Sequence, residues 1–357
     1  MATQRILLIR PSALGDVART APVAASLRRG FPDAEIHWLV RKGFEDAVRW
    51  HPAVDRVITF PRKELGRALR RGRMGELLRF ARELRQPGYD IAIDAQGLLR
   101  SALITRLTGA PVRVGPSDAR EGARLFYTLR VRSRRTHTVD RMLDLVRAMG
   151  VEARADMRLY RVGRFSESTS GSVERKDVGS ESRGTQSQVG SESRRTQGIV
   201  IAPTSRWEAK RWPVERFDAL VARLLAKKPG PVVLVGGPDE RDQCGPLLER
   251  ARWDPRVIDR VGDTGVGELM DLIADARLVV ANDSAAAHIA VGFDRPLVAL
   301  YGPTDVSKVG PYGRIEDVIQ DVRLGDTLNH KDPKNRVMME RITTEVVERA
   351  CLARLVG

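Results

Sequence analysis

"RILLIRPSALGDVARTAPV", residues 5–23, starts with a short apolar run that stops at Arg10-Pro11. After a loop of small residues that brings Gly15 and Asp16, a helix-compatible segment follows. A short buried strand, a tight loop and a helix are typical of the first unit of a parallel α/β sheet. Asp16 lies where the strand meets the helix. It either caps the helix, because aspartate accepts free N–H groups of a first turn, or faces a cleft and does chemistry there.

Strand-like and helix-like segments alternate in two blocks, and alternation of this kind predicts parallel strand pairing. We therefore expect an α/β protein with two Rossmann-like domains, 1–164 and 198–357, joined by a linker at 165–197. The expected strands are 5–9, 35–40, 54–60, 89–93, 112–114, 199–202, 231–235, 257–261, 278–281 and 297–301. The expected helices are 16–29, 64–85, 137–149, 213–226, 240–251, 267–276, 285–291 and 343–355.

The segment 165–197 is almost devoid of large apolar side chains. It contains a near-repeat, VGSESRGTQ at 178–186 and VGSESRRTQ at 189–197. Such a composition buries too little apolar surface to offset the entropy of ordering the chain. We expect a flexible low-complexity linker with no catalytic role.

The composition is that of a globular protein: 42% of the 357 residues are hydrophobic and 30% are charged. Two cysteines leave no room for a disulfide framework or a cysteine-rich metal site. No apolar run is long enough to cross a membrane and no signal peptide is recognisable, so we expect the cytoplasm. A net charge of +15 favours an anionic partner, and charge alone leaves nucleic acid, anionic lipid and a phosphorylated substrate open.

Polar groups follow the first strand of the second block, in "APTSRWEAKRWPVERF" at 202–217. Thr204 and Ser205 offer hydroxyls, Lys210 offers a positive charge, and Pro213 starts a helix. Hydroxyls, a lysine and a helix N-terminus suit a phosphate group. A solvated loop that happens to be basic would have the same sequence.

"LVVANDSAAAHIAVGFDRPLVALYGPT", residues 278–304, contains a second group of polar residues at a strand end. The strand ends at Asn282-Asp283-Ser284, and the helix that begins there has small residues, which leave its first N–H groups open to an anion. His288 lies on the first turns of this helix. It is either a hydrogen-bonded core residue or part of a ligand site, and the neighbouring Asp283 and Ser284 favour a site.

Several common sites are absent from the sequence. It has no GxGxxG, GxxxxGK[ST], HExxH or GxSxG motif, so no dinucleotide site, P-loop, zinc protease or serine hydrolase is predicted. Aromatic residues make up only 5% of the chain, too few for a surface that stacks bases, and nucleic acid is not expected as a partner. Residues 61–86 carry nine basic and three acidic side chains. They form either a solvated face or a surface for an anionic substrate or lipid.

Taken together, these segments resemble glycosyltransferase family 9, the bacterial heptosyltransferases of lipopolysaccharide core synthesis. The chain has, in the family's order, ILLIRPSALGDVARTAPV, AKRWPVERF, GGPDE and NDSAAAHIAVGFDRPLVALYGPT. DAQGLLRSAL at 94–103 and GPYG at 310–313 are also similar to family segments. The resemblance covers nearly the whole chain except the linker. It implies the GT-B fold, in which two Rossmann-like domains face a central cleft, with the acceptor on the first and the nucleotide-sugar donor, ADP-heptose in the family, on the second.

The resemblance also implies roles for individual residues. Asp16 occupies the position of the family's proposed general base, and Lys210 that of the lysine that neutralises the donor phosphates. Transfer would proceed with inversion, without a metal and without a cofactor. The other expected site residues bind the donor (Thr204, Ser205, Asp283, Ser284 and His288) or the acceptor (Arg10 and Arg100). The expected partners are ADP-heptose, an anionic lipopolysaccharide-type acceptor and, at most peripherally, the cytoplasmic face of the inner membrane.

The chain departs from the family pattern at two motifs. Ala285 stands where the family has glycine, and its methyl group and aversion to positive φ are expected to alter the approach of the phosphate. The late Cys-Met-x-x-Ile pattern appears at 337–342 without its cysteine. Two other functions stay open beside the transferase: a nucleotide-sugar epimerase or hydrolase on the same fold, and a non-catalytic protein that binds a polyanion.

Overall fold

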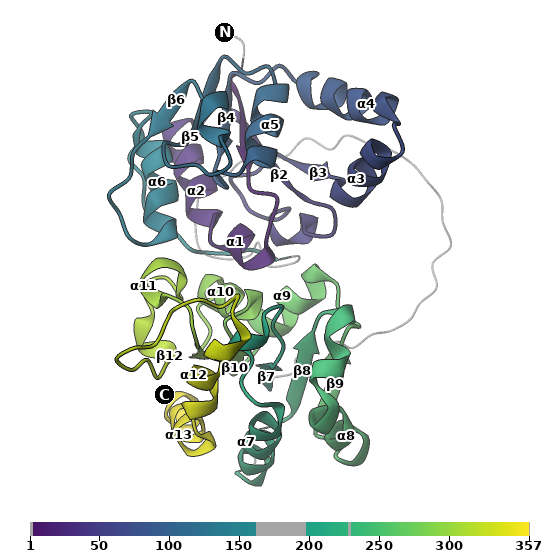
Figure 1. Ribbon diagram of the computed structural model, residues 1–357, viewed down its shortest axis with the longest axis vertical. Coiled ribbons are helices and arrows are strands. Elements are labelled where there is room, and N and C mark those ends of the chain that lie inside the picture. Colours follow the sequence, from purple (N-terminus) through teal and green to yellow (C-terminus); the bar gives the residue numbers. More distant parts are fainter. Residues whose placement is uncertain (1–2, 162–197, 228–229, 357) are drawn as a thin grey trace, which may run out of the picture.

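Each half of the chain forms one six-stranded sheet in this computed structural model, which describes residues 3–161, 198–227 and 230–356 (Figure 1). The first sheet has the order β3-β2-β1-β4-β5-β6 and the second the order β12-β11-β10-β7-β8-β9, and all pairs of neighbouring strands are parallel. Numbered within its own half, each sheet has the strand order of the doubly wound Rossmann fold. The predicted α/β architecture is confirmed. The strands are β1 Arg5–Ile9, β2 Glu35–Arg41, β3 Arg56–Phe60, β4 Ile91–Asp94, β5 Val112–Pro116, β6 Leu129–Val131, β7 Ile199–Ala202, β8 Val232–Gly236, β9 Val257–Val261, β10 Leu278–Asn282, β11 Leu297–Leu300 and β12 Val318–Ile319.

The helices of the two halves cover both faces of their sheets, because the central strands are apolar on both sides. In β1, Ile6 and Leu8 belong to one core cluster, whereas Leu7 and Ile9 belong to another on the opposite face. Side chains of a parallel strand alternate between faces, so a continuous apolar run requires helices on each side. The helices are α1 Leu14–Ala18, α2 Ala21–Gly30, α3 Arg62–Arg70, α4 Met74–Arg85, α5 Leu99–Leu107, α6 Thr138–Arg147, α7 Val214–Ala226, α8 Gly245–Trp253, α9 Val266–Ala274, α10 Ala285–Gly292, α11 Val306–Val309, α12 Val337–Arg341 and α13 Thr344–Val356.

Three expected helices are each broken into two pieces. The helix predicted at 16–29 is α1 and α2, and Pro22 lies in the first turn of the second piece. The helix predicted at 64–85 is α3 and α4, separated by Gly72 with a φ of +67°. The one predicted at 240–251 is a 3-10 turn followed by α8. Proline lacks the N–H that continues a helix and glycine readily adopts positive φ, so both mark these breaks. The short edge strands β6 and β12 were not predicted.

The two halves meet where α1 of the first lies against α10 of the second (Figure 1). Further contacts join them nearby: the Arg161 guanidinium pairs with Asp275 at 2.7 Å, and the N–H of Leu159 donates to the carbonyl of Gly292 at 2.8 Å. The predicted linker at 165–197 lies outside the described residues, and the domain boundaries at 164 and 198 stay predictions. The carboxyl ends of β1 and β10 both point to the junction, which is where open parallel sheets hold their ligands.

Candidate active site

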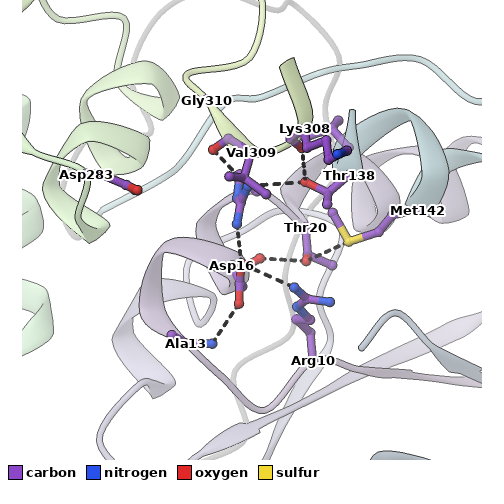
Figure 2. A network of polar contacts seen from close by, with 12 residues as sticks. Arg10, Ala13, Asp16, Thr20, Thr138, Met142, Asp283, Lys308, Val309 and Gly310 are labelled. Carbon is purple, nitrogen blue, oxygen red and sulfur yellow. Dashed lines mark hydrogen bonds and ion pairs between the residues drawn. The ribbon is translucent and has the colours of Figure 1, made fainter. Parts of the chain in front are cut away.

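Asp16 occupies the third position of α1, next to the junction (Figure 2). Its Oδ2 accepts the N–H of Ala13 at 3.1 Å, which satisfies one free donor at the start of the helix. Its Oδ1 forms an ion pair with Arg19 and lies 3.3 Å from the guanidinium of Arg10. One oxygen therefore caps the helix while the other belongs to a charged cluster at the junction, so the two interpretations of this aspartate are compatible.

The charges around Asp16 keep its carboxyl group ionised. Burial raises the pKa of this carboxyl, but the guanidinium groups of Arg10 and Arg19 and the N–H of Ala13 outweigh burial, and the pKa lies well below its ordinary value of 3.8. Asp16 is therefore a carboxylate at every physiological pH. It is also a weak base, because a base is most effective when its pKa is near the operating pH.

Lys210 and Asp283 face the junction from the second half. Lys210 ends a 3-10 turn at Glu208–Lys210, and its Nζ lies 2.6 Å from Oδ2 of Asp283, the residue that follows β10. The same oxygen accepts the hydroxyl of Thr304 at 2.7 Å. Both charged side chains are nearly buried, with 13% and 8% of their surface exposed. The ion pair with Asp283 fixes the position of the Lys210 ammonium group. This is the group that, by the family resemblance, is expected to neutralise the donor phosphates.

The start of α10 presents unpartnered polar atoms beside this ion pair. Within residues 3–161, 198–227 and 230–356, Ser284 Oγ and His288 Nδ1 are buried and have no hydrogen-bond partner. Buried polar groups are nearly always paired in folded proteins, so atoms of this kind mark the place of a ligand or water. Burial, together with the nearby Arg19 charge, lowers the pKa of His288 to about 3, so its imidazole is neutral at pH 7.

Gly15 allows the close contact between α1 and α10. A Cβ atom at this position would lie 2.8 Å from Cδ2 of His288 and 3.2 Å from Cα of Ala285. Carbon atoms pack at about 3.5–4.0 Å, so any side chain here would push the two halves apart. The glycine therefore brings Asp16 next to the start of α10.

The hydroxyl of Thr204 already has a partner in this structure. It donates to Oε2 of Glu240 at 2.6 Å, and the N–H of Ser205 donates to the side-chain carbonyl of Gln243 at 3.1 Å. Glu240 also accepts the N–H of Gly237 at 2.8 Å. Both predicted residues thus tie the loop after β7 to the 3-10 turn Pro238–Gln243 after β8.

Arg10 and Arg100, the two arginines predicted to bind an acceptor, lie in different places. Arg10 donates to the carbonyl of Ala95 and belongs to the Asp16 cluster. Arg100 is exposed on α5 and lines a pocket of about 110 Å³ at the carboxyl ends of the first sheet. The pocket is also lined by Arg41, which was not predicted, and by Arg62, which belongs to the basic segment 61–86 that the sequence offers for an anionic substrate or lipid.

Arg19 and Thr304 were likewise not predicted, although the sequence holds a signal for each. Arg19 follows Asp16 by three residues, the spacing that places two side chains together on a helix. Thr304 lies just beyond the end of β11, the strand beside β10. Neighbouring parallel strands bring their carboxyl ends to one edge, so polar groups that follow them meet.

Comparison with known proteins identifies the family. The family model for glycosyltransferase family 9 (heptosyltransferase) matches residues 77–336. The chain belongs to this family. Lipopolysaccharide heptosyltransferase 1 of Pseudomonas aeruginosa is 32% identical over 323 residues, which cover 87% of this chain and 82% of that protein. Lipopolysaccharide heptosyltransferase 1 of Escherichia coli K12 is 28% identical over 89% of this chain and 94% of its own.

The solved structure of E. coli heptosyltransferase WaaC with ADP matches this fold with a TM-score of 0.74 at 24% sequence identity. The match covers 98% of this chain and all of that one. The two sheets thus form the GT-B fold of the heptosyltransferases, as the resemblance predicted, and membership of glycosyltransferase family 9 makes the protein a glycosyltransferase.

Ala285, the departure from the family's glycine, is accommodated as the first residue of α10. In the described part of the chain, the residues other than glycine that have positive φ are Glu121 and Asp294. The expected conflict of Ala285 with a positive φ is therefore wrong. What the substitution adds to this family 9 site is a methyl group.

Proposed function

We propose that this glycosyltransferase moves a heptose from ADP-heptose to a lipopolysaccharide core acceptor, with inversion and without a metal ion. The observation that carries the proposal is the ionised carboxylate of Asp16 at the junction opposite the cluster of Lys210, Asp283, Ser284 and His288. Family membership supports the reaction class, and the heptosyltransferase relatives support the sugar and the acceptor.

The second half, residues 198–357, binds the donor in this proposal. The diphosphate lies at the start of α10, where free backbone N–H groups and the helix dipole favour an anion. Lys210 balances the charge that grows on the leaving ADP, since a fixed cation in a buried site stabilises developing charge strongly. Ser284 and His288 supply the unpartnered polar atoms for the phosphates or the sugar, and Thr204 and Ser205 hold the adjoining loop.

The reaction step uses Asp16 as the base. The acceptor hydroxyl attacks the anomeric carbon from the face opposite the diphosphate, so a C–O bond forms as the C–O bond to phosphate breaks, and the configuration inverts. The hydroxyl proton passes to Asp16, and ADP leaves with the bonding electron pair. Because the pKa of Asp16 lies below its ordinary value, the proton moves late, after the attacking oxygen has become strongly acidic.

The first half, residues 1–164, binds the acceptor. Arg41, Arg62 and Arg100 line its pocket, and the pKa of Arg41 is lowered by burial and by the charges of Arg62 and of Arg206 from the second half. Crowded guanidinium groups attract an anion, because an opposite charge relieves their mutual repulsion. An anionic lipopolysaccharide-type acceptor has the charge that these guanidinium groups attract.

Incubation of the purified protein with ADP-heptose and a heptose-deficient lipopolysaccharide tests the proposal. Equal amounts of ADP and of heptose-extended acceptor are expected, with the anomeric configuration opposite to that of the donor. Release of ADP without acceptor would favour a hydrolase, and a changed sugar without release of ADP would favour an epimerase. Binding of the acceptor with no turnover of a panel of nucleotide-sugars would favour a non-catalytic polyanion-binding protein.

We propose further that α3 and α4 contact the inner membrane from its cytoplasmic side. Leu69, Met74 and Leu78 on these helices have 62%, 53% and 63% of their surface exposed. Exposed basic side chains surround them (Arg62, Lys63, Arg67, Arg70, Arg71, Arg73, Arg79, Arg82 and Arg85). Apolar groups inside a basic surface favour a bilayer with anionic lipids. No helix in the described part of the chain is long and apolar enough to cross a bilayer.

Sedimentation with vesicles that contain anionic lipid tests this contact. Replacing the three apolar residues by serine is expected to weaken binding, whereas Leu125→Ser, which removes an equally exposed leucine (70%) outside these helices, is a matched control. Replacing Arg67, Arg70 and Arg71 by glutamate should also weaken binding. Unchanged binding of the arginine variant at low salt would contradict the contact.

A further inference from the structure

Arg19 connects Asp16 to the second half of the chain. Its side chain is buried, and one terminal nitrogen of the guanidinium pairs with Asp16. The other donates to the carbonyl of Val309 at 3.0 Å and to Oγ1 of Thr138 at 3.2 Å. A single guanidinium therefore contacts both the proposed base and the second half.

Val309 is one of three consecutive residues whose backbone carbonyl groups accept hydrogen bonds from the first half (Figure 2). We call them the docking carbonyls (Lys308, Val309 and Gly310). The carbonyl of Lys308 accepts the hydroxyl of Thr138 and that of Gly310 accepts Nε2–H of His137, each at 3.1 Å. The last carbonyls of a helix lack partners in the helix and carry partial negative charge, so the end of α11 suits these donors.

Arg10 holds the same carboxylate by contacts within the first half alone. It donates to the carbonyl of Ala95 and lies 3.3 Å from Oδ1 of Asp16. The docking carbonyls contribute nothing to these contacts. Arg19 differs, because one of its two terminal nitrogens is bonded to Val309 only while α11 lies against the first half.

We infer that Arg19 is a positioning residue, which fixes the Asp16 carboxylate more tightly when the docking carbonyls lie against the first half than when they do not. Contact between the two halves would thus speed proton transfer, beyond its role in bringing donor and acceptor together. The inference rests on the proposed role of Asp16 as the base.

Loss of Arg19 also has a defined effect on the pH profile. The groups near Asp16 are Arg10 after β1, Arg19 after α1, His137 before α6, and His288 and Asp283 at α10. Of the two arginines that lower the pKa of Asp16, removal of Arg19 leaves only Arg10. The pKa then rises toward 3.8, a larger fraction of Asp16 is protonated at low pH, and kcat starts to fall at a higher pH.

Three variants test the inference. Arg19→Met keeps an unbranched apolar stem and removes all donors. Thr138→Val keeps the ion pair of Arg19 with Asp16 but removes the hydroxyl that bonds to Lys308 and Arg19. Arg28→Met is the control, because Arg28 has a similar number of bonds within the first half, to Pro32, Ala34 and Asp55. Each is compared with the wild type by kcat, donor KM, the pH profile of kcat, and hydrogen exchange of peptide 306–313.

For Arg19→Met we expect kcat to fall on the order of 10²-fold, with donor KM within about threefold of the wild-type value. The acid limb of its pH profile of kcat should shift to higher pH. Thr138→Val should lower kcat roughly tenfold with an unchanged acid limb. Both of these variants should speed amide hydrogen exchange in peptide 306–313. The control Arg28→Met should change neither the kinetic quantities nor the exchange.

An active wild type whose Arg19→Met and Thr138→Val variants keep its kcat, or lose kcat with unchanged exchange in 306–313, would overturn the inference alone. A wild type that transfers no heptose would overturn the proposed function, and the inference with it.

Discussion

Substitution of Gly15 by alanine tests whether the proposed reaction needs the observed contact between α1 and α10. The new Cβ would lie 2.8 Å from Cδ2 of His288 and 3.2 Å from Cα of Ala285. Relief of the shorter contact to about 3.5 Å requires a shift of about 0.7 Å at the junction. A misplacement of about 1 Å costs on the order of 10²-fold in rate. We therefore expect kcat/KM for heptose transfer to fall by roughly 10- to 100-fold.

The assay is steady-state ADP release with ADP-heptose and a heptose-deficient lipopolysaccharide, with the fold checked by circular dichroism. Gly66→Ala is the matched control, because Gly66 lies within α3 and a Cβ there meets no atom within 4 Å. Alanine at that position should raise the free energy of unfolding by about 0.5–1 kcal/mol and leave activity unchanged. A folded Gly15→Ala variant with the kcat/KM of the wild type would show that the reaction does not need this contact between α1 and α10.

The remaining predictions concern Lys210, His288 and the metal-free reaction. Lys210→Met should lower kcat on the order of 10²–10³-fold in steady-state assays, with partial recovery in Lys210→Arg; an unchanged kcat would exclude Lys210 from leaving-group stabilisation. His288 should remain neutral in NMR titrations from pH 7 to pH 5, because burial lowers its pKa to about 3, and a midpoint near 6.5 would contradict this. Since the unfolded chain binds this proton more readily, the wild type should lose, relative to His288→Gln, about 1.4 kcal/mol of unfolding free energy per pH unit between about pH 6.5 and about pH 3 in urea titrations. EDTA should leave the transfer rate unchanged; loss of activity that Mg²⁺ restores would contradict the metal-free proposal.

Most of the fold could be predicted because apolar runs of strand length alternate with helix-compatible segments throughout both halves. The strands Arg5–Ile9, Ile199–Ala202 and Val257–Val261 match their predicted bounds. The breaks between α1 and α2 and between α3 and α4 were missed because helix-compatible residues lie on both sides of them, although Pro22 and Gly72 mark their places. The edge strands β6 and β12 have three and two residues, too few for a periodic signal.

From the sequence, the site could be predicted only as polar residues at the ends of separate strands. The sequence identifies Asp16, Lys210 and Asp283 as polar residues beyond buried strands, but their mutual positions depend on how the two halves meet. The pairing of Lys210 with Asp283 and the partners of Arg19 in α11 arise from tertiary contacts between distant segments. No local pattern contains that information.

The single-turnover rate of heptose transfer in Asp16→Asn decides whether Asp16 is the base. Asparagine keeps the size of the side chain and removes its charge and basicity. We expect a rate lower by about 10²–10⁴-fold than that of the wild type, with the affinity for ADP-heptose within a few fold of the wild type by calorimetry. A folded Asp16→Asn variant that transfers heptose at close to the wild-type rate would contradict the role of Asp16 as the base.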